Sequence, residues 1–297
     1  MSIRFDNRVA IVTGGAAGLG RAHAIGLAER GAHVVIADPG GADDVVAQIK
    51  AQGGTAEAHG IDISDEAAVR GLVADVIARL GRIDILVNNA GILRDKSFAK
   101  MPFDDFRKVL DVHLVGSALV THAVWPHMRA AGYGRVVFTS SASGLYGNFG
   151  QANYGAAKAG MLGLMNVLHL EGARDDIRVN MLAPTATTAM TEDLLPEDAA
   201  QLLAPEAITP GLLWLVSEDA PSRTILCAGA GCFATTQITE TDGICLSGDD
   251  LTPEAVAAHA ARLTDPEGAV GLTQAFDQTK RFAQKAAKAA GADLNWS

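Results

Sequence analysis

A glycine-rich turn constrains what this chain can fold into more than any other feature of its sequence. It lies between residues 8–13, an apolar run typical of a buried strand, and residues 21–30, which have the pattern of a helix. The turn contains Gly14, Gly18 and Gly20. A backbone that turns sharply and lets a pyrophosphate approach a helix N-terminus needs residues without Cβ. The spacing alone also suits an ordinary tight turn, but its place between strand and helix favours dinucleotide binding.

The same alternation of strand-like and helix-like segments continues along the chain. Further strands are expected at 33–37, 56–60, 83–87, 136–140 and 178–182, with helices at 43–50, 64–80, 103–131 and 153–174. This pattern predicts an α/β fold, a single Rossmann-type doubly wound parallel sheet with helices on both faces. Strand C-termini then share one edge, where ligands bind. We expect one nucleotide-binding domain over residues 1–230, and residues 231–297 as a C-terminal helical extension packing on the same domain.

Composition excludes some classes of protein. The net charge of −10, from 24 Lys and Arg against 34 Asp and Glu, argues against a nucleic-acid partner. No run of about 18 apolar residues suggests a membrane span. The N-terminus does not resemble a signal peptide, and the C-terminus does not resemble a Ser-Lys-Leu peroxisomal address. The odd cysteines Cys227, Cys232 and Cys245 match no metal or redox spacing, so we expect no metal, a reducing compartment and a cytoplasmic protein.

An acidic residue at the end of the second predicted strand bears on the choice of cofactor. Asp38 lies 18 residues after Gly20, where a carboxylate accepts both ribose hydroxyls of adenosine and repels a 2′-phosphate. No Lys or Arg lies in the turn or just after Asp38, which favours NAD over NADP. A solvated Asp that starts a turn is the alternative. Asp62 and Ile63 follow the third strand, where an adenine ring would lie. Their assignment as cofactor-binding residues rests on position alone.

Three polar residues in the second half of the chain suggest proton-transfer chemistry. Ser141 follows the fifth predicted strand, and Tyr154 and Lys158 share one face of a helix at positions i and i+4. An ammonium close to a phenol lowers the phenol's pKa, which is otherwise about 10. A serine hydroxyl can hold a carbonyl or alcohol oxygen. Each residue alone has a structural explanation, but the set beside a dinucleotide suits hydride transfer from an alcohol carbon.

These motifs together resemble the short-chain dehydrogenase/reductase family over residues 5 to about 228. The matching residues are Thr13-Gly14-x-x-x-Gly18-x-Gly20, Asn88-Asn89-Ala90-Gly91, Ser141 and Tyr154-x-x-x-Lys158. The resemblance implies Tyr154 as acid and base, Lys158 as a ligand of the nicotinamide ribose and Ser141 as the residue that orients the substrate oxygen. The expected cofactor-binding residues are Gly14, Gly18, Leu19, Gly20, Asp38, Asp62, Ile63, Asn89, Gly91, Tyr154, Lys158 and Thr188. The resemblance also implies that the protein forms a homodimer or homotetramer.

Two positions depart from the family pattern. His113 stands where the family usually has an Asn that supports a proton-relay water, and Pro184-Thr185 replaces a Pro-Gly pair. His113 is therefore a fourth catalytic candidate or a packed helix residue. Residues 88–99 and 140–154 resemble the (3R)-hydroxyacyl-CoA dehydrogenase domains of peroxisomal multifunctional enzymes type 2, a subgroup also called 17-beta-hydroxysteroid dehydrogenase type 4 that carries the same His.

The subgroup implies oxidation of a 3-hydroxyacyl-CoA with NAD, by a stand-alone dehydrogenase. The alternatives are a hydroxysteroid or steroid-side-chain CoA dehydrogenase, a 3-oxoacyl carrier-protein reductase, and a nucleotide-binding scaffold without activity. Residues 94–108 (net +2) and 278–292 (net +4) are candidate sites for CoA phosphates, or else solvated charged faces. Leu145, Tyr146 and Phe149 are expected to line the acyl pocket.

Overall fold

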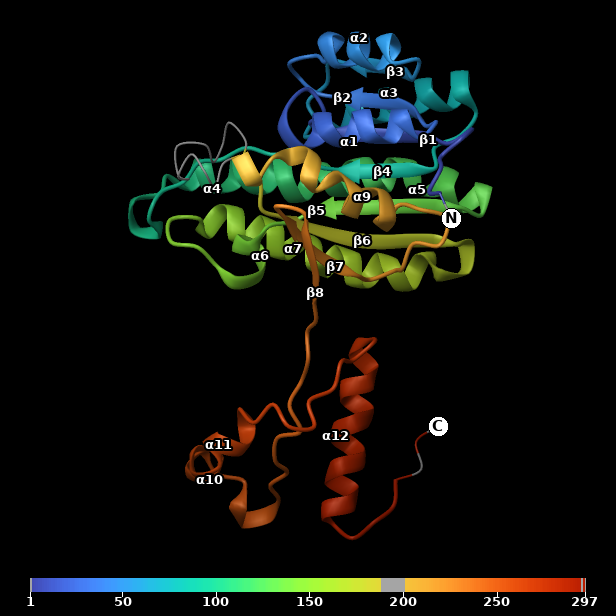
Figure 1. Cartoon of the computed structure of the whole chain (residues 1–297). Helices are drawn as coiled ribbons and strands as arrows, with labels where there is room; N and C mark the ends of the chain where they lie inside the picture. The colour runs from blue at the N-terminus through green and yellow to red at the C-terminus, as the bar shows by residue number, and fades with distance from the viewer. Residues whose placement is uncertain (1, 188–200, 295, 297) are drawn as a thin grey trace. The chain divides into compact units, whose positions relative to one another are not determined.

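The computed structural model describes residues 2–187, 201–294 and 296, and these form two compact units. The first unit runs from Met1 to Thr235 and the second from Thr236 to Ser297. The first holds the sheet and the predicted catalytic residues, and the second is a set of short helices and one longer one (Figure 1).

A single eight-stranded sheet organises the first unit, in the order β3-β2-β1-β4-β5-β6-β7-β8. The strands are β1 (Val9–Thr13), β2 (His33–Ala37), β3 (Thr55–His59), β4 (Ile85–Asn88), β5 (Gly134–Thr139), β6 (Ile177–Pro184), β7 (Ile225–Gly229) and β8 (Cys232–Thr236). The chain builds outward from β1 to β3 and then returns to build from β4 to β8. The strand order therefore reverses between β1 and β4, which is where open α/β sheets bind ligands.

The central strands pair in parallel with a continuous register. Ala10 pairs with Val34 of β2 on one side and Ile85 of β4 on the other, and β5 pairs with both β4 and β6. The residues of β1, β4 and β5 are all buried, as expected for strands covered on both faces. The predicted doubly wound sheet is confirmed.

Helices cover both faces of this sheet (Figure 1). They are α1 (Gly18–Glu29), α2 (Asp43–Ala51), α3 (Glu66–Leu80), α4 (Phe103–Leu110), α5 (Ser117–Ala131), α6 (Ala142–Tyr146), α7 (Ala152–Gly172) and α9 (Thr209–Leu215). One hydrophobic cluster joins Leu27, Val45 and Leu212 to one face, through α1, α2 and α9. A second cluster joins helices α3, α5 and α7 to the other face, through residues such as Val73 and Met161. The core is thus two layers, one on each side of the strands.

The expected helix over residues 103–131 contains a widened turn. A π-helical segment, Asp111–Gly116, lies between α4 and α5 and holds His113. Such segments are often found at functional sites. By length and composition alone, the stretch Phe103–Ala131 would be able to cross a membrane. Val120, Val124 and Met128 of this stretch are fully buried in the core of the sheet domain.

The last strand of the sheet was not predicted. Ala230 and Gly231, at φ 51° and 73°, form a turn between β7 and β8 whose two left-handed residues are typical of a type I′ hairpin. The sheet domain therefore reaches Thr235, beyond the boundary at residue 230 that the sequence suggested. The packing of the extension on the domain stays a prediction.

The second unit has no buried residue among those described. It contains α10 (Pro253–Ala258), α11 (Ala260–Leu263) and α12 (Ala275–Ala289). Thr252 caps α10, as the Thr-Pro-Glu sequence predicts, by accepting a hydrogen bond from the amide of Ala255. Arg281 of α12 binds Glu240 at 2.7 Å, which ties the helix to the start of the unit.

Candidate active site

The predicted site residues gather where β1, β4 and β5 end. The glycine turn follows β1, Asn89 follows β4, and Ser141 follows β5. Because these three strands are neighbours in the sheet, their C-terminal ends lie side by side (Figure 1). Residues separated by more than 100 positions in the sequence thus share one edge of the sheet.

The glycines of the turn are required by packing as well as by conformation. Gly14 and Gly18 have φ of 66° and 52°, in the left-handed region. A Cβ on Gly14 would lie 2.7 Å from Cα of Ala90. A Cβ on Gly20 would lie 2.1 Å from the Gly14 carbonyl oxygen and 2.6 Å from Nδ2 of Asn89. The turn therefore folds back onto its own helix and onto the loop after β4.

Asn89 and Thr13 hold this fold together. The Oγ1 atom of buried Thr13 accepts hydrogen bonds from the amides of Asn89 at 3.0 Å and Ala90 at 3.1 Å. The Asn89 side-chain amide donates to the carbonyls of Thr13 at 3.2 Å and Gly14 at 3.1 Å. Asn89 thus shapes the dinucleotide turn from the neighbouring strand, a structural role that its position after β4 alone did not reveal.

The start of α1 fits an anionic group. Its N-cap residue, Ala17, makes no side-chain hydrogen bond to the helix, and the first turn contains no acidic residue. By contrast, α3 is capped by the carboxylate of Asp65, which accepts from the amides of Ala67 and Ala68. The first amides of α1 therefore lack a side-chain acceptor and carry the positive end of the helix dipole, as a bound pyrophosphate requires.

Asp38 reaches the glycine turn from the end of β2. Its Oδ2 accepts from the amide of Ala16 at 3.2 Å, and its Oδ1 accepts from the amide of Gly40 at 3.0 Å. These bonds place a carboxylate beside the phosphate turn, where an adenosine ribose would lie. The residues present thus fit a dinucleotide such as NAD.

The other cofactor residues predicted from position lie at the same edge with different surroundings. Ile63 is buried, and its side chain packs against Gly116. Asp62 accepts hydrogen bonds from Ser64, and these bonds hold the pKa of its carboxyl below the usual value. Leu19, in the first turn of α1, is partly buried against the core. The predicted contact residue Thr188 lies outside the described residues.

Tyr154 lies in the first turn of α7, facing Ser141. Burial raises the pKa of the Tyr154 phenol above its ordinary value; a hydrogen bond with Ser141 lowers it in part, and the charge of Asp95 raises it further. The sequence predicted that Lys158 would lower this pKa. In the folded chain burial outweighs any such effect, so the phenol is protonated near neutral pH.

Lys158 is buried one helical turn beyond Tyr154. Its Nζ donates to the carbonyl of Thr139 at 2.5 Å and lies 5.4 Å from the centre of the Tyr154 ring. Burial lowers the pKa of Lys158 to about 7. Among the described residues no carboxylate pairs with Lys158, so its ammonium is available to a ligand.

His113 packs edge-on against Tyr154, with ring centres 5.2 Å apart at an angle of 90°. A Cβ on Gly91 would lie 2.1 Å from the imidazole, so Gly91 is the residue that makes room for this ring. Burial, and next the charge of Lys158, lower the pKa of His113 to about 3. His113 is therefore neutral, and its Nδ1 has no hydrogen-bond partner among the described residues.

Asn153 is a residue of the site that was not predicted from the sequence. Asn153 is fully buried, donates from Nδ2 to the carbonyl of Arg94 at 2.9 Å, and accepts the amide hydrogen of Tyr154 at 2.8 Å. It joins the loop after β4 to the first turn of α7. A polar residue directly before Tyr154 was visible in the sequence, but nothing local indicated that it would be buried.

The predicted substrate-side residues have mixed outcomes. Tyr146 and Phe149 are 68% and 90% exposed, so their side chains are open to solvent, whereas Leu145 packs partly into the core.

The two basic stretches predicted as CoA sites lie close to acidic residues. In the first stretch, Arg94, Arg107 and Lys108 lie 3.9, 3.4 and 3.8 Å from carboxylates. In the second, Arg281 and Lys285 bind Glu240 and Asp242. Both stretches are therefore partly neutralised.

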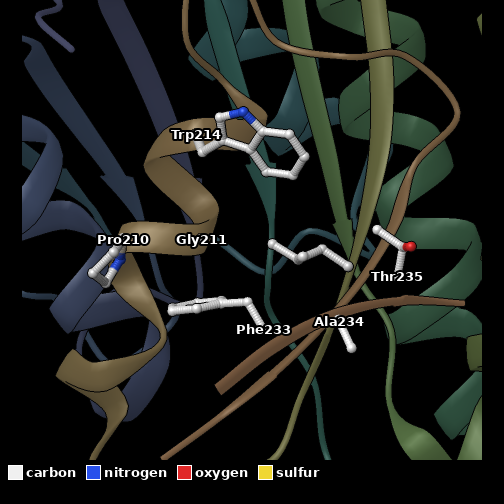
Figure 2. Close-up of a pocket in the computed structure, with 7 residues that line it drawn as sticks. Pro210, Gly211, Trp214, Phe233, Ala234 and Thr235 are labelled. Carbon is white, nitrogen blue, oxygen red and sulfur yellow. The ribbon is translucent and has the colours of Figure 1, made fainter. Parts of the chain in front are cut away.

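An apolar cavity of about 450 Å³ has a different set of lining residues (Figure 2). Trp214 of α9 and Phe233 of β8 form part of its wall (Figure 2). None of its lining residues is ionisable, and none is a predicted site residue. It therefore offers no group for the proton transfer that the sheet edge can perform.

Comparison with known families matches residues 8–199 to the family described as short chain dehydrogenase. Peroxisomal multifunctional enzyme type 2 of Mus musculus is 45% identical over 277 residues, covering 89% of this chain and 37% of that enzyme. A short-chain type dehydrogenase/reductase of Mycobacterium tuberculosis is 42% identical over 278 residues, covering 89% of this chain and 96% of that protein. The chain thus spans little more than a third of the mouse enzyme.

Two solved structures are similar to this chain in fold and in sequence. Full-length peroxisomal multifunctional enzyme type 2 from Drosophila melanogaster superposes with a TM-score of 0.84 at 36% identity, covering 96% of this chain and 50% of that one. A 7 alpha-hydroxysteroid dehydrogenase complexed with NADH has a TM-score of 0.72 at 32% identity, covering 77% and 95%. The expectation of a cytoplasmic protein is contradicted, because the mouse and Drosophila relatives are named as peroxisomal enzymes. That expectation rested on the cysteine content, on the termini and on the lack of a long apolar run.

Proposed function

The chain belongs to the short-chain dehydrogenase family, and from that premise we propose that it transfers hydride between NAD(H) and the C3 hydroxyl or keto group of a 3-hydroxyacyl-CoA. Tyr154 is the acid and base of this reaction. The observation that carries the proposal is the position of Tyr154 at the carboxyl edge of the sheet, where its phenol hydrogen-bonds with Ser141 and its ring centre lies 5.4 Å from Nζ of buried Lys158.

Tyr154 handles the proton of the C3 oxygen. In the oxidative direction the phenolate takes the hydroxyl proton while the hydride leaves C3, so the alcohol becomes a ketone. In the reductive direction the neutral phenol donates that proton. Ser141 holds the substrate oxygen by a hydrogen bond next to the phenol, and positioned acids and bases of this kind contribute about 10²–10⁴-fold to a rate.

Lys158 and the glycine turn would hold the cofactor. The buried ammonium of Lys158 suits the ribose hydroxyls on the nicotinamide side, and the first amides of α1 suit the pyrophosphate. In its oxidised form NAD accepts the hydride and brings a positive charge, which favours the ionised phenol. This charge opposes the effect of burial on the pKa of Tyr154.

Asp38 supports NAD over NADP. Its carboxylate is held beside the turn by two backbone amides, so it cannot easily move away from a 2′-phosphate. The same carboxylate accepts hydrogen bonds from the free ribose hydroxyls of NAD.

The substrate class rests on the names of relatives. The mouse relative is a multifunctional enzyme whose subgroup the sequence already resembled, and an acetoacetyl-CoA reductase of Shinella zoogloeoides is 40% identical over 226 residues. A hydroxysteroid is the second candidate, because the 7 alpha-hydroxysteroid dehydrogenase structure is also similar. By likeness to the family we further propose a homodimer or homotetramer.

A steady-state screen tests the proposal. It compares 3-hydroxyacyl-CoAs of increasing chain length, both C3 stereoisomers, 17β-hydroxysteroids and 3-oxoacyl carrier-protein substrates, each with NAD and with NADP. We expect turnover of one thioester stereoisomer with NAD. Turnover of steroids alone would replace the substrate assignment, and tight NADH binding without turnover of any substrate would favour a nucleotide-binding scaffold.

A further inference from the structure

Three successive residues of the loop after β4 are bonded to the segment that precedes Tyr154. The Arg94 carbonyl accepts from Asn153 at 2.9 Å, the Asp95 carboxylate accepts from Nε2 of Gln151 at 2.7 Å, and the Lys96 amide donates to the carbonyl of Gly150 at 2.9 Å. The backbone on both sides of Asp95 is thereby fixed. Its carboxylate consequently has a defined place beside the candidate active site.

The side chain of Gln151 links Asp95 to the serines of the site. Gln151 is the N-cap residue of α7, yet its side chain makes no bond to the free amides of that helix. Its Oε1 instead accepts from Oγ of Ser143 at 2.7 Å and from Nδ2 of Asn148 at 3.2 Å. The amide of Ser143 in turn donates to Oγ of Ser141 at 3.2 Å, and Ser141 contacts the phenol.

A carboxylate at position 95 decides which way the Gln151 amide points. An ionised carboxylate only accepts hydrogen bonds, so the NH₂ group of Gln151 must face Asp95 and its carbonyl must face Ser143 and Asn148. Without that acceptor both orientations of the amide become available. Ser143 would then lose a fixed partner, and the alignment of Ser141 would loosen.

We propose that Asp95 is a positioning residue for Tyr154, acting through Gln151 and Ser143 on Ser141 and through its own negative charge on the phenol. The proposal rests on the proposed function, since it assigns to Asp95 a role in the same proton transfer. Asp95 touches neither substrate nor cofactor in the proposed reaction, and it lies 59 positions from Tyr154 in the sequence.

The charge of Asp95 acts on Tyr154 with little competition. Among the described residues, three titratable side chains lie near the Tyr154 ring or act on its phenol: Lys158 from the same helix, His113 from the π-helical segment, and Asp95 from the loop after β4. Lys158, with a pKa of about 7, and His113, with a pKa of about 3, are both neutral at the high pH where this phenol ionises. Asp95 is then the remaining charge, and it opposes ionisation.

The test measures the pKa of Tyr154 directly, without substrate. The chain contains three tyrosines, so ring-labelled [¹³Cζ]tyrosine gives three resonances, and Tyr154→Phe identifies the one of interest. Titration runs from about pH 8 to about pH 12, because burial holds the pKa of the Tyr154 phenol above its ordinary value of about 10. The variants are Asp95→Asn, which removes the charge and keeps an acceptor, Asp95→Ala, which removes both, and Asp104→Asn, an exposed carboxylate on α4, as control.

We expect Asp95→Asn to lower the pKa of Tyr154 by about 0.3–0.5, a size suited to an exposed charge, with the difference shrinking in high salt. Asp95→Ala should lower it similarly and also reduce kcat about tenfold with little change in KM, because Ser141 loses its alignment. Asp104→Asn should change neither.

An unchanged Tyr154 pKa in both Asp95 variants would overturn the proposal. If Asp95→Asn fails to fold, wild-type protein decides: the pKa must fall as salt rises, and a constant pKa overturns the idea. The titration also separates this proposal from the proposed function. A shifted pKa without turnover of any thioester or steroid leaves Asp95 as a positioning residue and removes only the reaction.

Discussion

Nε2 of His113 lies 2.9 Å from the amide nitrogen of Ile92 and 2.8 Å from the carbonyl oxygen of the same residue. A single imidazole nitrogen either donates or accepts, so it satisfies one of these groups at a time. The neutral ring therefore leaves one backbone group of Ile92 without its partner. An Asn side chain has a donor and an acceptor together, which gives a physical reason why the family usually has Asn at this position.

Replacing His113 separates these roles. His113→Asn should retain folding and most of the activity, because its amide can meet both groups of Ile92. His113→Ala should lose about 1–3 kcal/mol of unfolding free energy, since it leaves backbone groups unpaired and a void beside Gly91. Chemical denaturation and steady-state kinetics measure both effects. Equal stability of the two variants would contradict the account.

The glycine turn allows a sharp test with a matched control. Gly20→Ala places a methyl group 2.1 Å from the Gly14 carbonyl oxygen, so the turn must open and NADH binding should be lost. Gly71→Ala, at an exposed position of α3 where a Cβ meets no atom within 4 Å, should stabilise the protein by about 0.5–1 kcal/mol. NADH fluorescence and thermal unfolding report the two outcomes. Normal NADH affinity in Gly20→Ala would show that the turn adapts.

Asp38→Ala should change the preference for cofactor. Loss of a charged acceptor for the ribose should raise KM for NAD about 10- to 100-fold, and removal of its negative charge should make NADP usable. Initial rates over a range of each cofactor give both numbers. Asp44→Asn, an exposed carboxylate on α2, controls for a change in overall charge. An unaltered ratio of kcat/KM for NAD and NADP would remove Asp38 from this role.

Tyr154→Phe should reduce kcat by about 10³-fold or more and leave the Kd for NADH within about twofold. The ring that packs against His113 and Lys158 remains, so only the hydroxyl is lost. Tyr133→Phe is the control, because its ring lies between Arg8 and Arg135, far from the glycine turn in the sheet. Substantial turnover in Tyr154→Phe would mean that another group transfers the proton.

Two buried histidines make the fold sensitive to acid. Burial lowers the pKa of His23 and of His113 to about 3, whereas an unfolded His has a pKa of about 6.5. Between these values the unfolded chain binds more protons, so stability is complete above about pH 6.5 and is lost as pH falls toward 3. For each pH unit within this range, each His changes the free energy of unfolding by up to about 1.4 kcal/mol.

Denaturation at several pH values between about 4.5 and 6.5 measures this slope, above the range where carboxylates titrate. His23→Leu should reduce the slope by about one proton, and His122→Leu, at an exposed position on α5, should leave it as in the parent. A slope that does not change in His23→Leu would show that His23 does not titrate between the folded and unfolded states.

Local pattern was enough to predict the architecture, and it also selected candidate site residues that the structure brings to one edge of the sheet. Alternating apolar runs and helical stretches predicted the parallel sheet, because each segment's period reflects which of its faces is buried. The glycines between a strand and a helix, and a Tyr four residues before a Lys, are relations within a few positions of the chain. Such relations survive in the sequence because they are set by the geometry of one turn or one helix.

The tertiary structure decided what these residues experience. Burial raises the pKa of Tyr154, where spacing to Lys158 suggested the opposite, because desolvation depends on everything that packs around the phenol. Gly20 is required by the backbone of Gly14 and by Asn89, and Asp95 reaches the site through Gln151, 56 residues away. The strand order brings these segments to one edge of the sheet, and no local pattern encodes which distant side chains will meet there.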